Sequence, residues 1–230
     1  MYKTLIQWFK SENLLVQAKE LVIEMLGEDL KMFNDSIKLL WTDMGVTIDE
    51  IRERDRDINR HVREVRKKVL THLAFSGASG LDTSLTLINM VVDIERIGDH
   101  TKDIGYLATD FPGVFNPGDF RDEVKELERA IADRLVSLVD IFENGEEGSG
   151  KALQLTRTHA KINQDYHRML ERLLGEENST LTTSQSAKLA LYLRYLRRVD
   201  GHIFNIASSK VNPFHRIGFR KKNKKKQTSA

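Results

Sequence analysis

The chain has 230 residues, of which 40% are hydrophobic and 30% charged, so it can build a core and is not expected to be disordered. Three prolines and 14 glycines are too few for an all-β sandwich. The absence of cysteine excludes disulfides and thiolate metal sites. No apolar run reaches the roughly 18 residues of a membrane-spanning helix, and the opening segment MYKTLIQWFKSEN lacks the apolar stretch of a signal peptide. We therefore expect a cytoplasmic protein.

The net charge of +2 hides an uneven distribution along the chain. Residues 211–230 hold seven Lys and Arg and no acid, which leaves 29 basic and 34 acidic residues, a net charge of −5, in residues 1–210. Such a basic tail is typical of a solvated chain end or a weak anion-binding segment. The basic residues of 214–226, together with Phe214 and Phe219, which could insert into a membrane interface, favour contact with the anionic inner face of the membrane. Nucleic acid is the less favoured polyanionic partner.

The first half of the chain predicts three long helices. The first covers about residues 11–44, with residues 2–9 as a short separate leading helix. Thr47 and Glu50 form a capping box for the second, which runs to about Phe75. The loop 76–80 follows, and Asp82 is the expected N-cap of the third helix, about 83–109.

The second half repeats this pattern after a cluster of prolines and glycines at residues 111–118. Further helices are predicted at about 120–143, 151–174 and 183–210. Thr182 and Gln185 form a second capping box at the start of the last of these, and Pro213 ends it.

Two sequence segments indicate that the second half is a diverged copy of the first. DRDINRH at 55–61 aligns with HAKINQD at 159–165, 104 residues later, and ERIGDHTKDI at 95–104 aligns with RRVDGHIFNI at 197–206, 102 residues later. We therefore predict an all-α fold of two tandem three-helix bundles. Residues 1–111 form the first bundle, 119–210 the second and 211–230 the basic tail.

Carboxylates gather on one face of the predicted helix 83–109. Glu95, Asp99 and Asp103 continue a row that begins with apolar Leu85, Ile88 and Val92, which predicts partial burial and therefore a need for a compensating cation. Arg96 and Lys102 are the nearest cations in the sequence, and partial neutralisation by either is one way to compensate the row. The preceding helix offers Asp55 and Asn59 one turn apart.

These oxygens predict a metal site across the two helices. Its expected ligands, which we call the acidic face, are Asp55, Asn59, Glu95, Asp99 and Asp103. Oxygen ligands favour hard cations such as iron, manganese or magnesium, and zinc becomes an option if His100 joins. A solvated acidic surface is the alternative interpretation.

The string ERIGDH at 95–100, after an apolar run and before Asp103-Ile104, resembles the signature of the PhoU family, and Asp55-x-x-x-Asn59 resembles its partner element. The resemblance covers about residues 10–210 and implies two tandem three-helix bundles. It also implies iron or zinc clusters held by paired acidic motifs, and a non-enzymatic role in regulating phosphate uptake. The implied partners are a phosphate transporter and a sensor kinase, with a homodimer as one possible assembly.

The second half departs from that family pattern. His159, Arg197 and Gly201 stand where the family places acidic residues, so we expect no second metal cluster. Arg194 and Arg197 are interpreted as salt-bridging residues, with anion binding as the alternative. No nucleophile elbow or phosphate-binding glycine loop occurs, so no enzyme is expected. A helical transcriptional regulator that binds DNA through its tail and a metal-dependent phosphohydrolase remain alternative functions.

Overall fold

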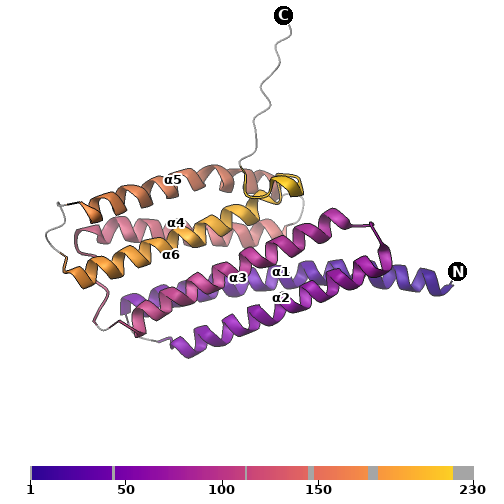
Figure 1. Cartoon of the computed structure of the whole chain (residues 1–230), viewed down its shortest axis with the longest axis horizontal. Helices are drawn as coiled ribbons and strands as arrows, with labels where there is room; N and C mark the ends of the chain where they lie inside the picture. The colour runs from indigo at the N-terminus through magenta and orange to yellow at the C-terminus, as the bar shows by residue number, and fades with distance from the viewer. Residues whose placement is uncertain (1, 43–44, 112, 145–147, 176–180, 220–230) are drawn as a thin grey trace, which may run out of the picture.

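A computed structural model of the chain describes residues 2–42, 45–111, 113–144, 148–175 and 181–219 (Figure 1). These residues form six helices and no strand, as the predicted all-α fold requires. The helices are α1 (Tyr2–Thr42), α2 (Ile48–Ser76), α3 (Leu81–Thr109), α4 (Arg121–Glu143), α5 (Ser149–Leu174) and α6 (Thr183–Ser208). Short 3-10 turns, η1 (Gly118–Phe120) and η3 (Phe214–Arg216), precede α4 and follow α6. None of the helices in the described ranges is long and apolar enough to cross a bilayer.

Local sequence signals mark the starts of α2 and α6. Both predicted capping boxes are present, at Thr47 with Glu50 and at Thr182 with Gln185. The predicted N-cap at Asp82 is wrong: α3 begins two residues earlier than predicted, at Leu81, after Gly80 in a left-handed conformation with φ of 71°, and Asp82 lies in the first turn. The expected break near residue 10 is also absent, because α1 is continuous from Tyr2.

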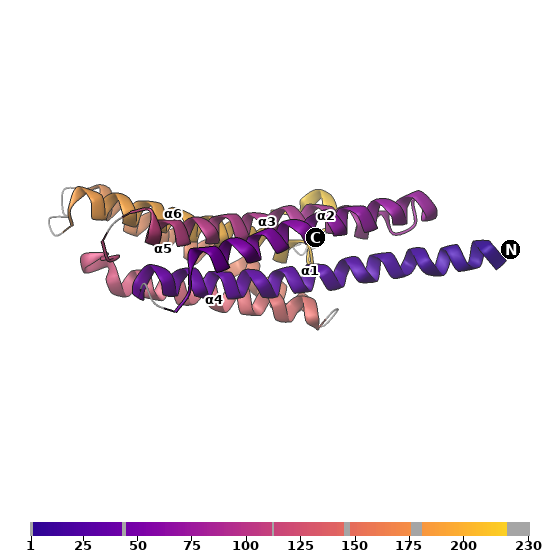
Figure 2. The same cartoon turned by 90° about the horizontal axis from the view of Figure 1, so that it is seen from below.

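The six helices pack as two three-helix bundles joined side by side. Helices α1, α2 and α3 pack against one another, as do α4, α5 and α6 (Figure 1). The bundles meet where α3 packs along α6 and α1 packs along α4 (Figure 2). The duplicated pattern in the sequence therefore corresponds to two adjacent copies of one helical motif.

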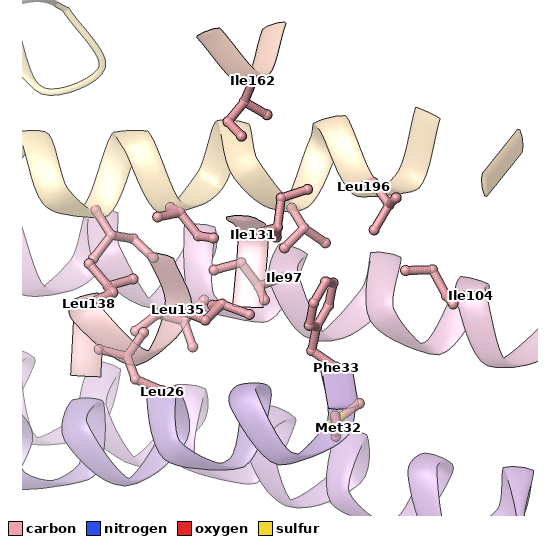
Figure 3. Close-up of a cluster of buried hydrophobic side chains, with 14 of the residues drawn as sticks. Leu26, Met32, Phe33, Ile97, Ile104, Ile131, Leu135, Leu138, Ile162 and Leu196 are labelled. Atoms are coloured by element: carbon pink, nitrogen blue, oxygen red, sulfur yellow. The ribbon is translucent and has the colours of Figure 1, made fainter. Parts of the chain in front are cut away.

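One continuous core spans both bundles, with buried residues from all six helices. Figure 3 shows Leu26 and Phe33 of α1 and Ile97 of α3 near Ile131 and Leu135 of α4. Hydrogen bonds also link the two bundles at this interface. The Oε1 atom of Glu128 on α4 accepts hydrogen bonds from Trp41 of α1 and Tyr192 of α6, each at 2.6 Å. The division into residues 1–111 and 119–210 stays a prediction, since the two bundles share this core.

Residues 211–219, the part of the basic tail that the structure describes, are hydrogen-bonded to one another and to the end of α6. The side-chain amide of Asn212 donates to the carbonyl oxygens of Arg216 and Phe219, at 3.1 and 2.6 Å. The backbone N–H of Gly218 donates to the Ser208 hydroxyl at 2.7 Å. Residues 220–226, which carry most of the predicted membrane-contacting charge, lie outside the described residues.

Candidate functional site

The acidic face lies where the partly exposed flank of α3 meets α2, which carries Asp55 and Asn59. The expectation that its carboxylates continue a core row is wrong, because Val92 is 38% exposed and the buried row of α3 runs instead through Met90, Ile94, Ile97, Thr101 and Ile104. Asp55 of α2 is nevertheless buried, with 7% exposure, and Asp99 is half-buried.

Lys102 bridges the two central carboxylates of this face. Its Nζ lies 2.7 Å from Oδ2 of Asp55 and 3.3 Å from Oδ1 of Asp99. Burial lowers the pKa of Lys102, but the hydrogen bonds and charges of Asp55 and Asp99 outweigh this effect, so the pKa lies above its ordinary value. The chain therefore supplies its own cation to the face where the sequence predicted a metal.

The five predicted ligands do not converge on one point. The side-chain amide of Asn59 donates to the backbone oxygen of Asp55 at 3.0 Å, and Asp103 lies 3.7 Å from Nδ1 of His100. Arg96 pairs with Asp99 at 3.0 Å. In the described part of the chain, no three His, Asp or Glu side chains stand close enough to hold an ion in this conformation, Glu95 included.

Sequence reasoning missed Asp29 of α1, which is fully buried behind this face. Neither of its carboxylate oxygens has a hydrogen-bond partner among the described residues. Burial raises the pKa of Asp29 well above its usual range, and the charges of Asp55 and Asp99 raise it further. One signal was available: Asp29 interrupts the buried row of α1 between Leu26 and Phe33, at spacings of three and four.

Gly98 of α3 allows Asp29 to approach. A Cβ atom on Gly98 would lie 3.2 Å from Oδ1 of Asp29 and 3.8 Å from Oδ1 of Asp55. The glycine therefore leaves room for two carboxylates from two other helices beside the α3 backbone.

The equivalent positions of the second bundle form a pocket of about 260 Å³, which we call the basic pocket. All five counterparts of the predicted metal ligands line it, at offsets of 104 and 102 residues. The lining residues are His159, Asn163, Arg197, Gly201 and Asn205, together with Arg198, His202 and Phe204. The duplicated site thus has the opposite charge.

Two buried carboxylates behind the pocket orient its histidines. Asp200 lies 2.6 Å from Nδ1 of His159, and Asp93 of α3 lies 2.7 Å from Nδ1 of His202. Asp93 also accepts a hydrogen bond from the amide of Asn205 at 2.9 Å. Each histidine therefore has Nδ1 committed to a carboxylate, which leaves Nε2 for other contacts.

A buried arginine stands in the second bundle where the first bundle has Asp29. Arg134 of α4 is buried, donates to Asp200 and the carbonyl oxygen of Leu155, and stands 105 residues after Asp29. Asp200 in turn stands 102 residues after Gly98. The second bundle thus has an ion pair where the first has a lone carboxylate beside a glycine.

The interpretation of Arg194 and Arg197 as salt-bridging residues finds no support: neither forms an ion pair within the described ranges. Arg197 donates instead from Nε to Oδ1 of Asn163 at 2.8 Å, and its guanidinium lies 5.0 Å from the centre of the Tyr166 ring.

Comparison with known proteins confirms the family resemblance. Residues 22–108 match the PhoU domain. A curated relative from Synechocystis sp., described as a phosphate-specific transport system accessory protein PhoU homolog, is 24% identical over 205 residues, which cover 85% of this chain and 87% of the relative.

Two solved structures share the fold. The phosphate transport system regulatory protein PhoU from Streptococcus pneumoniae superimposes with a TM-score of 0.65 at 17% identity, covering 90% of this chain and 95% of that one. PhoU from Pseudomonas aeruginosa gives a TM-score of 0.67 at 20% identity, covering 90% and 96%.

Proposed function

We propose that this chain, whose residues 22–108 match the PhoU domain, regulates phosphate transport and phosphate signalling without catalysing a reaction. The observation that carries the proposal is the domain match, which includes both halves of the acidic face. The curated relative, matched over most of both chains, is described as an accessory protein of phosphate transport. The proposal includes a cytoplasmic location at the inner membrane face, with a phosphate transporter and a sensor kinase as partners.

Uptake of radiolabelled phosphate tests this function in cells of the source organism. Deleting the gene should alter the response of uptake to external phosphate, and the wild-type gene should restore it. Uptake that is unchanged by the deletion at both high and low phosphate would refute the regulatory role.

We also propose that the acidic face binds a hard cation, iron or zinc by the family resemblance and manganese or magnesium by ligand type. Its donors would be Asp55, Asn59, Glu95, Asp99 and Asp103, which would have to move together to share one ion. The buried, unpartnered carboxylate of Asp29 adds oxygen donors of the type that such an ion prefers. The bound ion would supply positive charge to the face. In its absence, the ammonium of Lys102 forms ion pairs with Asp55 and Asp99.

Elemental analysis of protein purified without a chelator or an affinity metal tests the cation proposal. Asp99→Ala should lose the metal, and His159→Ala, the matched change near the basic pocket, should keep it. Metal retained by the Asp99→Ala protein would refute a single site on the acidic face.

A further inference from the structure

We propose that the basic pocket of the second bundle binds inorganic phosphate. The existence of an oxyanion site rests on the geometry of the pocket, whereas the choice of phosphate among oxyanions rests on the proposed function. The pocket occupies the position that corresponds to the acidic face of the first bundle, so one chain would carry a cation site and an anion site at equivalent places.

Charge supports an anionic ligand. Arg197 and Arg198 both line the pocket, and no carboxylate does. Within the part of the chain that the structure describes, neither guanidinium forms an ion pair. Their Nε atoms are occupied, by Asn163 at 2.8 Å and by His100 at 3.4 Å, so the terminal nitrogens remain for a ligand. A guanidinium presents a planar fork of donors that matches two oxygens of a phosphate.

The negative charges near the pocket already have partners. Asp200 accepts from Arg134 and contacts His159, while Asp93 contacts His202 and accepts from Asn205. These carboxylates therefore position the lining histidines and leave the two arginines uncompensated.

The histidines offer a means to distinguish phosphate from sulfate. When a neutral histidine donates from Nδ1 to a carboxylate, its Nε2 carries a lone pair that can accept a hydrogen bond. Nε2 of His202 is buried and has no partner among the described residues. Phosphate retains a hydroxyl near neutral pH that can donate to this nitrogen, whereas sulfate has none.

The pocket also has room for the ligand. Its volume of about 260 Å³ exceeds that of a single phosphate, and a Cβ atom on Gly201 would meet nothing within 4 Å. Position 201 therefore accepts a side chain without a clash, which makes it a suitable place to change the charge of the pocket.

Titration calorimetry of the full chain with inorganic phosphate, in a phosphate-free buffer, tests the proposal. We expect one phosphate per chain. Arg197→Met should weaken binding by about tenfold or more, as expected for the loss of a charged hydrogen-bond donor. Arg194→Met, an exposed arginine one turn earlier on α6, should change the dissociation constant by less than about twofold.

A pair of variants at Gly201 separates charge from shape. Gly201→Asp should abolish phosphate binding, and Gly201→Asn, of nearly the same size, should retain most of it. Melting curves of both proteins verify that they fold. Absence of phosphate binding by the wild-type chain at millimolar concentration, or equal binding by the Asp and Asn variants, would overturn the oxyanion site. Sulfate binding as tight as phosphate binding would overturn the assignment of the ligand.

The two proposals fail independently. Calorimetric binding that depends on Arg197 in a chain whose deletion leaves uptake unchanged would refute the regulatory function and keep the anion site. An uptake defect that the Arg197→Met gene restores fully, together with no calorimetric binding, would refute the phosphate site and keep the function.

Discussion

The guanidinium of Arg134 and the carboxylate of Asp200 form a buried ion pair between α4 and α6. Asp200 is fully buried, and the positive charge of Arg134 offsets the cost of burying its carboxylate inside the second bundle. Asp200 in turn holds His159 at the edge of the basic pocket.

Arg134→Met should lower the free energy of unfolding by about 3–5 kcal/mol, because it leaves Asp200 as a buried carboxylate without its cation. Urea denaturation followed by circular dichroism measures the change. Arg157→Met, an exposed arginine on α5, should stay within about 0.5 kcal/mol of wild type. A loss below about 1 kcal/mol for Arg134→Met would show that the pair contributes little to stability.

Lys102→Met should destabilise the metal-free protein and strengthen metal binding. The change removes the cation that pairs with Asp55 and Asp99 and frees those oxygens for an added ion. Melting curves in chelator and calorimetric titration with Mn²⁺ measure the two effects, with exposed Lys67→Met as the control. Weaker Mn²⁺ binding by Lys102→Met would contradict competition between the lysine and the metal.

A chelator should lower the melting temperature of metal-loaded protein at neutral pH. A ligand at about 100 times its Kd adds about 2.7 kcal/mol to the stability, which corresponds to about 5–10 °C for a chain of this length. The difference should shrink at mildly acidic pH, since protons compete with the ion for the carboxylates. Superimposable curves at neutral pH, from protein shown beforehand to contain metal, would count against the site.

The capping box of α2 predicts a defined pH dependence. Hydrogen bonds from the backbone and the hydroxyl of Thr47 lower the pKa of Glu50 from its usual 4.5. Because the folded-state pKa is depressed, the stabilisation is complete above the unfolded pKa and disappears as the pH falls through the folded value. Wild type should therefore melt above Glu50→Gln at pH 7, and the gap should close as the pH falls below 4.5, through the lowered pKa of folded Glu50. A difference in melting temperature that widens on acidification would contradict a lowered pKa of Glu50 in the folded state.

Truncation distinguishes the two parts of the basic tail. Removing residues 220–230 should leave the melting temperature unchanged. Removing residues 214–230 should preserve the helical content but lower the melting temperature, because it deletes the acceptors of Asn212 and the Gly218 N–H that binds Ser208. Equal melting temperatures for the two truncated chains would show that the segment 214–219 adds no stability.

The sequence allowed the helices to be predicted because their signals are local. The capping box at Thr47 and the apolar spacing of α3 act within a few residues. Asp82 was assigned wrongly as a cap because Gly80, with its left-handed backbone, begins the helix earlier. The candidate site was predicted less completely, because Lys102 reaches Asp55 across 47 residues and Asp29 reaches Gly98 from another helix. Only the tertiary packing brings these groups together.

The joining of the two bundles in one chain has a consequence for the symmetry of their sites. Two identical subunits related by a twofold axis must present identical sites, since any substitution appears in both. Here the two copies are parts of one chain and pack through α3 and α6 (Figure 2). A substitution in one copy therefore leaves the other unchanged, so the two sites can differ, as Asp99 and Gly201 do at equivalent positions.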